Sequence, residues 1–316
     1  MKKKSPKASP ETAAPLDFAS KARAFWTPEQ TAKVTGGKRY PLMPGEAPEL
    51  LRVMSLLNSD GSMSADSVRK FQQANHMLNL LLTQLDDLCE RHKTVYVLDA
   101  CCGSSFIALI VAWYLIEKKK HPCHVVGIDH NEAVIAKSNE RAKALGWEAS
   151  VRFMAGDVDK DAWSKALTTL FPNEEPSRPH LLCALHACDT ATDHALALGI
   201  AAQADQMAIA PCCQAELAKQ WSQLPPDGHP LQAIFQSPNL RRDTAATFTD
   251  ALRLLLVRAK GYEVTATEFV PSAHTPKNRL LMCTRRGRFH RESEQQYAAM
   301  KEALAGTTIT LESLLA

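Results

Sequence analysis

Long hydrophobic runs are missing from this sequence of 316 residues. The longest nearly apolar run, Phe106–Ile116, is too short for the ~20 residues that a membrane-spanning helix needs. Three lysines, Lys2 to Lys4, stand at the N-terminus, but no apolar segment follows them as it would in a secretory signal. We therefore expect a cytoplasmic protein with no membrane partner.

Strong net charge and spaced cysteine pairs are missing as well. The net charge is +3, which is too small to select a class of partner. None of the nine cysteines forms a C-x-x-C pair or a zinc-finger spacing, which indicates a reducing compartment rather than a disulfide framework. The content of 45% hydrophobic and 22% charged residues is ordinary for a globular protein.

Glycine is scarce where a nucleotide-binding protein would be expected to need it. Val95–Asp99 reads as a short buried strand, and the turn that follows contains one glycine, Gly103. An apolar helix comes next, so this stretch begins a βαβ unit. Ligands bind beyond the carboxyl ends of strands in such sheets. A carboxylate beside a turn with few bare N–H groups suits a pyrophosphate poorly, and suits S-adenosylmethionine (SAM) better than NAD.

The rest of the chain alternates strands and helices. The segment Pro271–Asn278 is too short for a crossover helix, so the last two strands should form an antiparallel hairpin. We interpret Gln223–Leu240 as an inserted loop. The pattern predicts an α/β fold: a seven-stranded Rossmann-like sheet with a terminal antiparallel hairpin and an N-terminal helical extension. The further predicted strands are His124–Asp129, Ser150–Ala155, Leu181–His186, Gln206–Ala210, Tyr262–Val270 and Arg279–Thr284.

Four segments follow from this pattern. Residues 1–17 are a basic tail that we expect to be disordered. Residues 18–92 form an N-terminal helical region, 93–288 the cofactor-binding domain, and 289–316 a C-terminal helical tail.

Three acidic residues end or follow the first three strands: Asp99, Asp129 and Asp157. A carboxylate at the end of the second strand can accept hydrogen bonds from ribose hydroxyls. Asp157 can accept from an exocyclic adenine amine. Asp99 can either order the turn or meet a cationic group. Together they indicate a site for an adenosine-containing cofactor.

Short motifs around these acids resemble those of class I SAM-dependent methyltransferases: D-A-C-C-G at 99–103, G-I-D at 127–129 and A-G-D at 155–157. Three later motifs, L-H-A-C-D-T-A-T-D at 185–193, P-C-C-Q at 211–214 and H-T-P-K-N at 274–278, narrow the resemblance. They are similar to a subfamily that contains tRNA acceptor-stem 2′-O-methyltransferases and the methyltransferase-like-25 proteins. The resemblance covers about residues 70–285.

The resemblance implies roles for individual residues. SAM would be bound by Asp99, Cys101, Gly103, Asp129, Asp157 and Val158, and the catalytic residues would be His186, Cys188 and Asp189. The resemblance places Pro211, Cys212 and Cys213 at the methyl-transfer site. From their positions in the predicted fold we add Lys70, Asn75, His274, Lys277 and Asn278 to the acceptor side. One departure is clear: the usual D-x-G-x-G-x-G has Cys101 and Ser105 at its outer glycine positions, and Cys101 narrows the space beside the methionine part of SAM.

Several of these residues have a structural alternative. His186 is either a general base, since its ordinary pKa of about 6.5 suits proton transfer, or an anchor for Asp189 or Asp193. The cysteines that should converge with it at one edge of the sheet either hold zinc or pack as small hydrophobes, and we favour packing without a metal.

The acceptor-side residues also have both a functional and a structural interpretation. Lys70 and Asn75 lie on the polar side of the predicted helix 66–90, which either forms a wall of the site or faces water. His274, Lys277 and Asn278 either touch an acceptor phosphate or only pin the hairpin.

The resulting functional hypothesis is a SAM-dependent methyltransferase whose acceptor is RNA, with a ribose hydroxyl as one option, by family analogy. One alternative is a non-catalytic SAM- or RNA-binding module, suggested by the glycine-poor turn. The other is an NAD-dependent oxidoreductase, which shares the strand-turn-helix start. The sequence does not indicate the oligomeric state.

Overall fold

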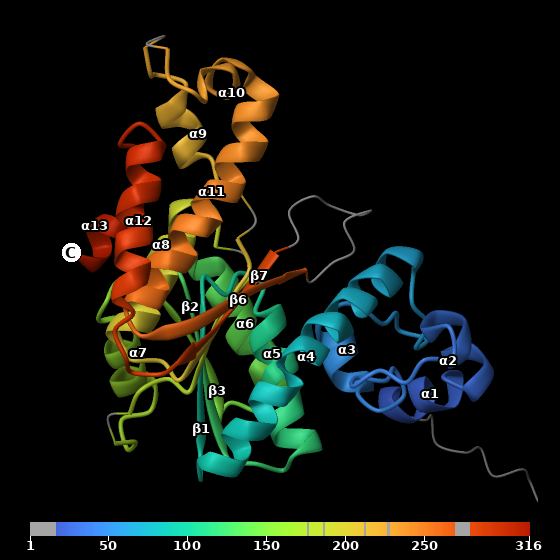
Figure 1. The fold of residues 1–316 in the computed structure, drawn as a ribbon. Helices are drawn as coiled ribbons and strands as arrows, with labels where there is room; N and C mark the ends of the chain where they lie inside the picture. Colours follow the sequence, from blue (N-terminus) through green and yellow to red (C-terminus); the bar gives the residue numbers. More distant parts are fainter. Residues whose placement is uncertain (1–16, 176, 186, 212, 226–227, 269–278) are drawn as a thin grey trace, which may run out of the picture. The chain divides into compact units, whose positions relative to one another are not determined.

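The structure is a computed structural model that describes residues 17–175, 177–185, 187–211, 213–225, 228–268 and 279–316 (Figure 1). The chain divides into two compact units after Phe71, inside helix α4 (Ala65–Arg91). The first unit contains three short helices and the start of α4. These are α1 (Phe18–Phe25), α2 (Pro28–Thr35) and α3 (Pro48–Val53).

The helices of the first unit begin at side chains that cap them. Asp17 accepts a hydrogen bond from the Ser20 N–H at the start of α1, and Thr27 accepts one from Gln30 at the start of α2. The indole N–H of Trp26 donates to the Gly61 carbonyl at 2.9 Å, which fixes the loop before α4. This part of the chain is therefore helical, which agrees with the predicted N-terminal helical extension.

The second unit is built on one seven-stranded sheet with the order β3-β2-β1-β4-β5-β7-β6. Its first five strands are parallel, and β7 runs antiparallel to both of its neighbours. The predicted α/β class and terminal antiparallel hairpin are confirmed. The strands are β1 (Val95–Ala100), β2 (Cys123–Asp129), β3 (Val151–Ala155), β4 (Leu181–Ala184), β5 (Gln206–Ile209), β6 (Tyr262–Glu268) and β7 (Arg279–Arg285).

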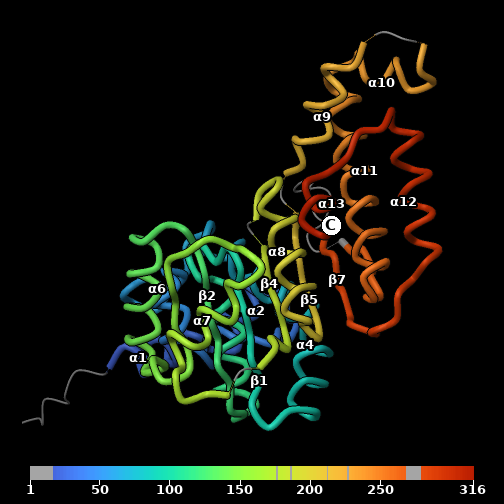
Figure 2. The backbone as a smooth tube through the Cα atoms, turned by 90° about the vertical axis from the view of Figure 1, so that its left-hand side faces the viewer, coloured from blue at the N-terminus to red at the C-terminus, as the bar shows by residue number. Residues whose placement is uncertain are grey.

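Helices cover both faces of this sheet. Figure 2 shows α9 to α12 gathered on the side of β5 and β7, and α6 and α7 on the side of β2 and β3. The helices of this unit after α4 are α5 (Phe106–Trp113), which continues as a π-helical turn η1 (Tyr114–Lys118), α6 (Glu132–Ala144), α7 (Ala162–Leu170), α8 (Thr190–Ala201), α9 (Glu216–Trp221), α10 (Gln232–Gln236), α11 (Pro238–Ala259), α12 (Arg291–Ala303) and α13 (Thr310–Leu315).

The core lies where the central strands meet α7, α8 and α11. Every residue of β1, β4 and β5 is buried, as expected for parallel strands that are covered on both faces. Tyr96 and Leu98 of β1 belong to one apolar cluster with Trp163 of α7 and Leu252 of α11. This packing holds the strand ends, and therefore the candidate site, in fixed positions.

One predicted loop is wrong. Residues 223–240 include α10 and the first residues of α11, which begins at Pro238. Proline is favoured in the first helical turn because its missing N–H has no partner there in any case. The six-residue helix α9 was also not predicted, because so short a segment shows no clear helical period.

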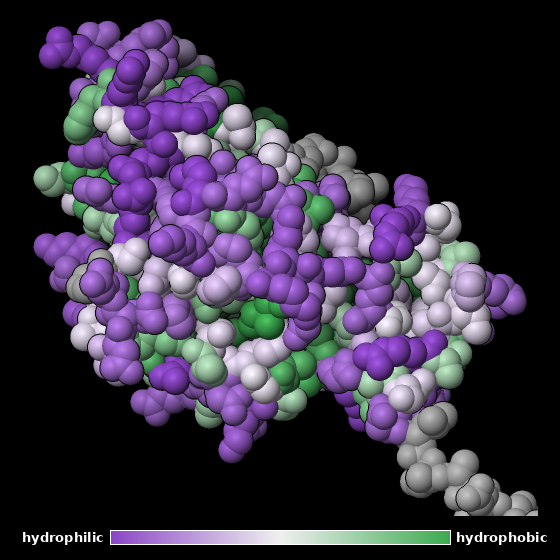
Figure 3. All heavy atoms as spheres, turned by 90° about the horizontal axis from the view of Figure 1, so that it is seen from below, coloured by the Kyte–Doolittle hydropathy of each residue, from purple (hydrophilic) through white to green (hydrophobic). Residues whose placement is uncertain are grey.

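The face of the molecule shown in Figure 3 is mostly hydrophilic, and its apolar side chains form small patches. None of the helices that the structure describes combines the length and the apolar character that crossing a bilayer requires.

Candidate functional site

The turn after β1 has the backbone of a glycine-rich loop although it contains one glycine. Cys101, Gly103 and Ser105 all have a positive φ, of 56°, 48° and 58°. These are the three glycine positions of the D-x-G-x-G-x-G pattern. An L-residue in this left-handed region costs about 1–2 kcal/mol, so the fold holds Cys101 and Ser105 there against their preference.

Asp99 ties the end of β1 to helix α5. Its carboxyl group is buried, and Oδ2 accepts a hydrogen bond from the Ala108 N–H at 3.2 Å. Burial, with a smaller contribution from the negative charge of Asp129, raises the pKa of Asp99 to about 7. Of its two predicted roles, ordering the turn is therefore the one that this geometry favours.

Asp129 joins the ends of β1 and β2. Its Oδ2 accepts from the Gly103 N–H at 2.9 Å, and its Oδ1 accepts from the Asn131 N–H at 3.0 Å. Each carboxylate oxygen can accept a second hydrogen bond, so the group can still receive ribose hydroxyls. Asp157 beyond β3 is exposed, and Val158 beside it is half-buried. The turn and these carboxylates fit the adenosine part of SAM.

Asp189, one of the residues predicted to be catalytic, is used structurally. Its Oδ1 accepts hydrogen bonds from the N–H groups of Ala215 and Glu216 at 2.8 and 3.2 Å, where α9 begins. Its own N–H donates to the Cys213 carbonyl at 3.1 Å. Its φ of 50° is again in the left-handed region. Asp189 therefore fastens the loop after β4 to the loop after β5, and its catalytic role stays a prediction.

A buried ionic network lies behind these loops. Arg253 of α11 is fully buried and binds both carboxylate oxygens of Asp193 at 2.8 and 3.0 Å. It also donates to the Asp189 carbonyl at 2.8 Å and lies 3.4 Å from Asp250. Among the residues that the structure describes, Arg253 thus anchors Asp193, the role that one alternative gave to His186.

Asp250 extends this network toward the surface. It accepts two hydrogen bonds from the Gln214 amide at 3.1 and 3.2 Å and one from Arg279 at 3.0 Å. Sequence reasoning missed the network. The available signal was an acid and an arginine three residues apart, Asp250 and Arg253, inside an otherwise apolar helix face.

A cleft with four charged side chains in its lining opens at the same edge of the sheet. We call it the acceptor cleft. Its volume is about 270 Å³. It lies beside the end of β5, because the register that pairs Ile209 with Leu281 places Arg279 next to Pro211. It is lined by Pro211, Gln214, Arg242, Asp243, Ala246, Thr247, Asp250 and Arg279.

The remaining predicted residues divide into three groups. Pro211, Cys188 and Cys213 lie at the ends of β4 and β5 as expected, with Cys188 exposed. Lys70 is an exposed residue of the first unit. Asn75 is not on the polar side of α4: it is buried, because it follows the buried Phe71 by one helical turn. The predicted residues His186, Cys212, His274, Lys277 and Asn278 lie outside the described part of the chain.

One group of possible metal ligands occurs among the described residues, at the opposite edge of the sheet: His92, His180 and Asp205. The Nδ1 atom of His180 accepts the Tyr96 N–H at 3.2 Å, so the neutral ring carries its proton on Nε2. Arg178 already neutralises Asp205 at 2.7 Å. Without a lone pair on His180 Nε2, this group is poorly suited to a cation.

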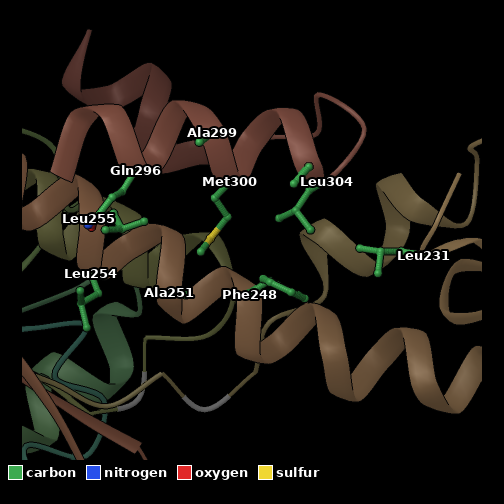
Figure 4. A pocket seen from close by; sticks show the side chains of 10 residues that line it. Leu231, Phe248, Ala251, Leu254, Leu255, Gln296, Ala299, Met300 and Leu304 are labelled. Carbon is green, nitrogen blue, oxygen red and sulfur yellow. The ribbon is translucent and has the colours of Figure 1, made fainter. Parts of the chain in front are cut away.

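A second cleft, of about 590 Å³, lies between α10, α11 and α12 (Figure 4). Its lining side chains, among them Phe248, Leu254 and Met300, are apolar except for Gln296. It offers no acid, base or cation for methyl transfer, so we do not assign the reaction to it.

Comparisons with known proteins give a family match and distant structural likenesses. Residues 69–220 match a family model described as a methyltransferase domain. No curated protein sequence matches the chain. The magnesium protoporphyrin IX methyltransferase of Synechocystis PCC 6803 with bound S-adenosylhomocysteine (SAH) is 14% identical, with 75% of this chain and 93% of that chain covered and a TM-score of 0.40. The SAH-bound Podospora anserina methyltransferase PaMTH1 is 11% identical, with 86% and 98% covered and a TM-score of 0.42.

Three features of the structure agree with the match over residues 69–220: the strand order, the turn after β1, and the carboxylates at that edge of the sheet. Residues 69–220 are similar to a methyltransferase domain, and this match together with the fold and the cofactor site supports a SAM-dependent methyltransferase.

Proposed function

We propose that the methyl acceptor is RNA and that a ribose hydroxyl is the group methylated. The observation that carries the proposal is the acceptor cleft, where the guanidinium groups of Arg242 and Arg279 lie beside the end of β5. Arginine is the side chain best suited to phosphate. The resemblance of the motifs at 185–193 and 211–214 to the tRNA acceptor-stem 2′-O-methyltransferases supports the same acceptor class.

Alignment is the main task of the site. Bound SAM would supply a methyl group on a sulfonium. Its transfer to a well-placed ribose oxygen would break the S–CH3 bond, leave SAH, and require a base to take the hydroxyl proton. Asp129 and Asp157 would hold the adenosine, and the turn at 101–105 would bring its backbone against the methionine part. Asp189, fixed by Arg253 and by α9, would set the loop that faces the acceptor. His186 remains the candidate base for the hydroxyl proton.

The glycine-poor turn no longer favours a non-catalytic module. Cys101 and Ser105 hold the positive φ that glycine would adopt, so the backbone keeps the shape that cofactor binding needs. We also propose that the enzyme works in the cytoplasm, in keeping with its nine cysteines.

The proposal is tested by incubating the protein with methyl-labelled SAM and fractionated cell extract. We expect the label in material that ribonuclease releases and that protease does not. The Asp129→Ala variant should lose SAM binding in calorimetry and incorporate no label, and a His186→Ala variant that binds SAM but does not turn over would identify the base. Label confined to protein or small molecules would contradict an RNA acceptor.

A further inference from the structure

We propose that the acceptor cleft binds one nucleotide of the acceptor, with its phosphate against Arg242 and Arg279 and a hydrogen-bond donor of its sugar or base against Gln214. This inference rests on the proposed function and gives that function a specific subsite. The cleft belongs to the second unit, on the same sheet edge as Asp129.

Arg242 and Arg279 each have more guanidinium N–H groups than their pairs within the protein use. Arg242 is 65% exposed, and its Nε donates to the adjacent Asp243 at 3.1 Å. Arg279 is 36% exposed and uses its two Nη atoms for Asp250 and Thr247, at 3.0 and 2.9 Å. A guanidinium has five N–H groups in a planar fork, so an anion can be bound while these pairs persist.

The position of Arg242 is not explained by helix stability. It lies near the N-terminus of the 22-residue helix α11, whose first turn contains no acidic residue and whose N-cap residue Ser237 makes no side-chain capping bond. Arg241, in the first turn, donates to the Phe235 carbonyl at 2.6 Å. Arg242 begins the second turn, still near the positive end of the helix dipole, where cations are unfavourable. An anion bound in the cleft would remove this cost.

Gln214 adds a hydrogen-bond acceptor, its side-chain carbonyl oxygen, to the arginine donors of the cleft. It is 6% exposed, and its amide nitrogen must face Asp250, because a carboxylate only accepts hydrogen bonds. Its carbonyl oxygen is buried and has no hydrogen-bond partner within the described part of the chain. A buried acceptor without a partner is costly, and Gln214 lines the cleft, so a hydrogen-bond donor of a bound ligand would relieve this cost.

Asp243 and Asp250 also line the cleft, but each is already paired with an arginine. The remaining arginine N–H groups and the Gln214 oxygen together favour an anion that also carries a hydroxyl or amine donor. A nucleotide has both in one unit, and a volume of about 270 Å³ suits one such unit rather than a segment of a protein partner.

The test is calorimetric binding of the four ribonucleoside monophosphates and their parent nucleosides to the full chain, with SAH saturating the cofactor site. We expect at least one monophosphate to bind and Arg242→Gln to weaken it by about tenfold, as for one lost charge-assisted hydrogen bond. The parent nucleoside should not respond to Arg242→Gln. Gln214→Leu, checked for folding by circular dichroism, should weaken both ligands.

Arg286→Gln is the matched control, because Arg286 is 61% exposed and pairs with Glu263 beyond the other end of β7. It should leave binding unchanged. Equal effects of Arg242→Gln and Arg286→Gln, or no monophosphate binding at all, would overturn the nucleotide subsite. Nucleotide binding without label transfer to RNA would instead count against the proposed function, so the two failures are distinguishable.

Discussion

Cys101 holds a conformation that glycine adopts more easily. Its φ of 56° costs about 1–2 kcal/mol of backbone strain, which a glycine would relieve. Glycine also loses more conformational entropy on folding, which offsets part of this gain. We predict that Cys101→Gly raises the free energy of unfolding by about 0.5–1 kcal/mol. The removal of the side chain should also tighten SAM binding. Urea denaturation and calorimetry measure the two effects.

Cys102 provides the control for this prediction. It is buried and is not among the residues of positive φ, so glycine there loses packing without relieving strain. Cys102→Gly should therefore lower the stability. If both glycine variants were destabilised equally, the strain assigned to Cys101 would be wrong.

Asp99 should make the folded state less stable as the pH rises, whereas most carboxylates make it more stable. Burial raises its pKa to about 7 from the ordinary 3.8, so the folded state prefers the protonated form. Its contribution is complete below pH 3.8 and is lost as the pH rises to 7, by about 4 kcal/mol at 1.36 kcal/mol per unit. We predict that Asp99→Asn gains stability over the wild type as the pH rises from 4 to 8 in urea denaturation. Parallel curves for the two proteins would contradict it.

Single residues show where sequence reasoning succeeds and where it stops. Asp129 was predicted to lie at a strand end because a run of apolar residues ends there. The buried position of Asn75 and the capping role of Asp189 were not predicted, since both depend on which distant segment packs against them. The periodicity of a sequence indicates its local secondary structure, but it does not indicate which distant residues will pack against it.

At the scale of elements, helix α9 depends on a cap from another loop. Asp189 Oδ1 accepts the N–H groups of Ala215 and Glu216, and Ala215 itself offers no side-chain cap. We predict that Asp189→Ala lowers the free energy of unfolding by about 1 kcal/mol, whereas Asp189→Asn, which keeps the acceptor, does not. Thermal denaturation measures this. A loss of turnover in Asp189→Asn with an unchanged melting temperature would restore the catalytic role.

Helix α11 is attached to α8 by a buried ion pair. Removing Arg253 leaves Asp193 as a buried charge without its partner, which costs about 3–5 kcal/mol. We therefore expect Arg253→Met to lower the free energy of unfolding by that amount in urea denaturation. The control is Asp193→Asn in the Arg253→Met background, which removes the uncompensated charge and should recover stability. If it did not, the pair would not be the cause.

The elements themselves were predictable in proportion to their length and periodicity. The five parallel strands are apolar runs between turn residues, and Asn131, a residue type that commonly caps helices, caps α6. The helices at 216–221 and 232–236 were not predicted, because five or six residues show no reliable period. Much of the acceptor cleft is built from α11 and the loop after β5, so it could not be derived before those packed together.

At the scale of the whole second unit, the two edges of the sheet have opposite chemistry. The carboxyl edge holds Asp99 and Asp129 beside the turn after β1. The amino edge holds the stacked rings of His92 and His180, 3.6 Å apart, and Asp205 paired with Arg178. Because both histidines precede strands, the amino edge contributes to stability and leaves the carboxyl edge to the reaction.

This division predicts how the protein responds to acid. Burial lowers the pKa of His92 and lowers that of His180 to about 4, so the unfolded chain binds more protons below pH 6.5. Stability should therefore be lost as the pH falls from 6.5 toward 4. His180→Asn keeps an acceptor for the Tyr96 N–H and removes the titrating ring, so its urea midpoint should fall less over this range. His130→Asn, at a side chain that is 86% exposed, is the control and should follow the wild type. A wild-type midpoint that stays constant between pH 6.5 and 4.5 would contradict the burial of a neutral histidine pair.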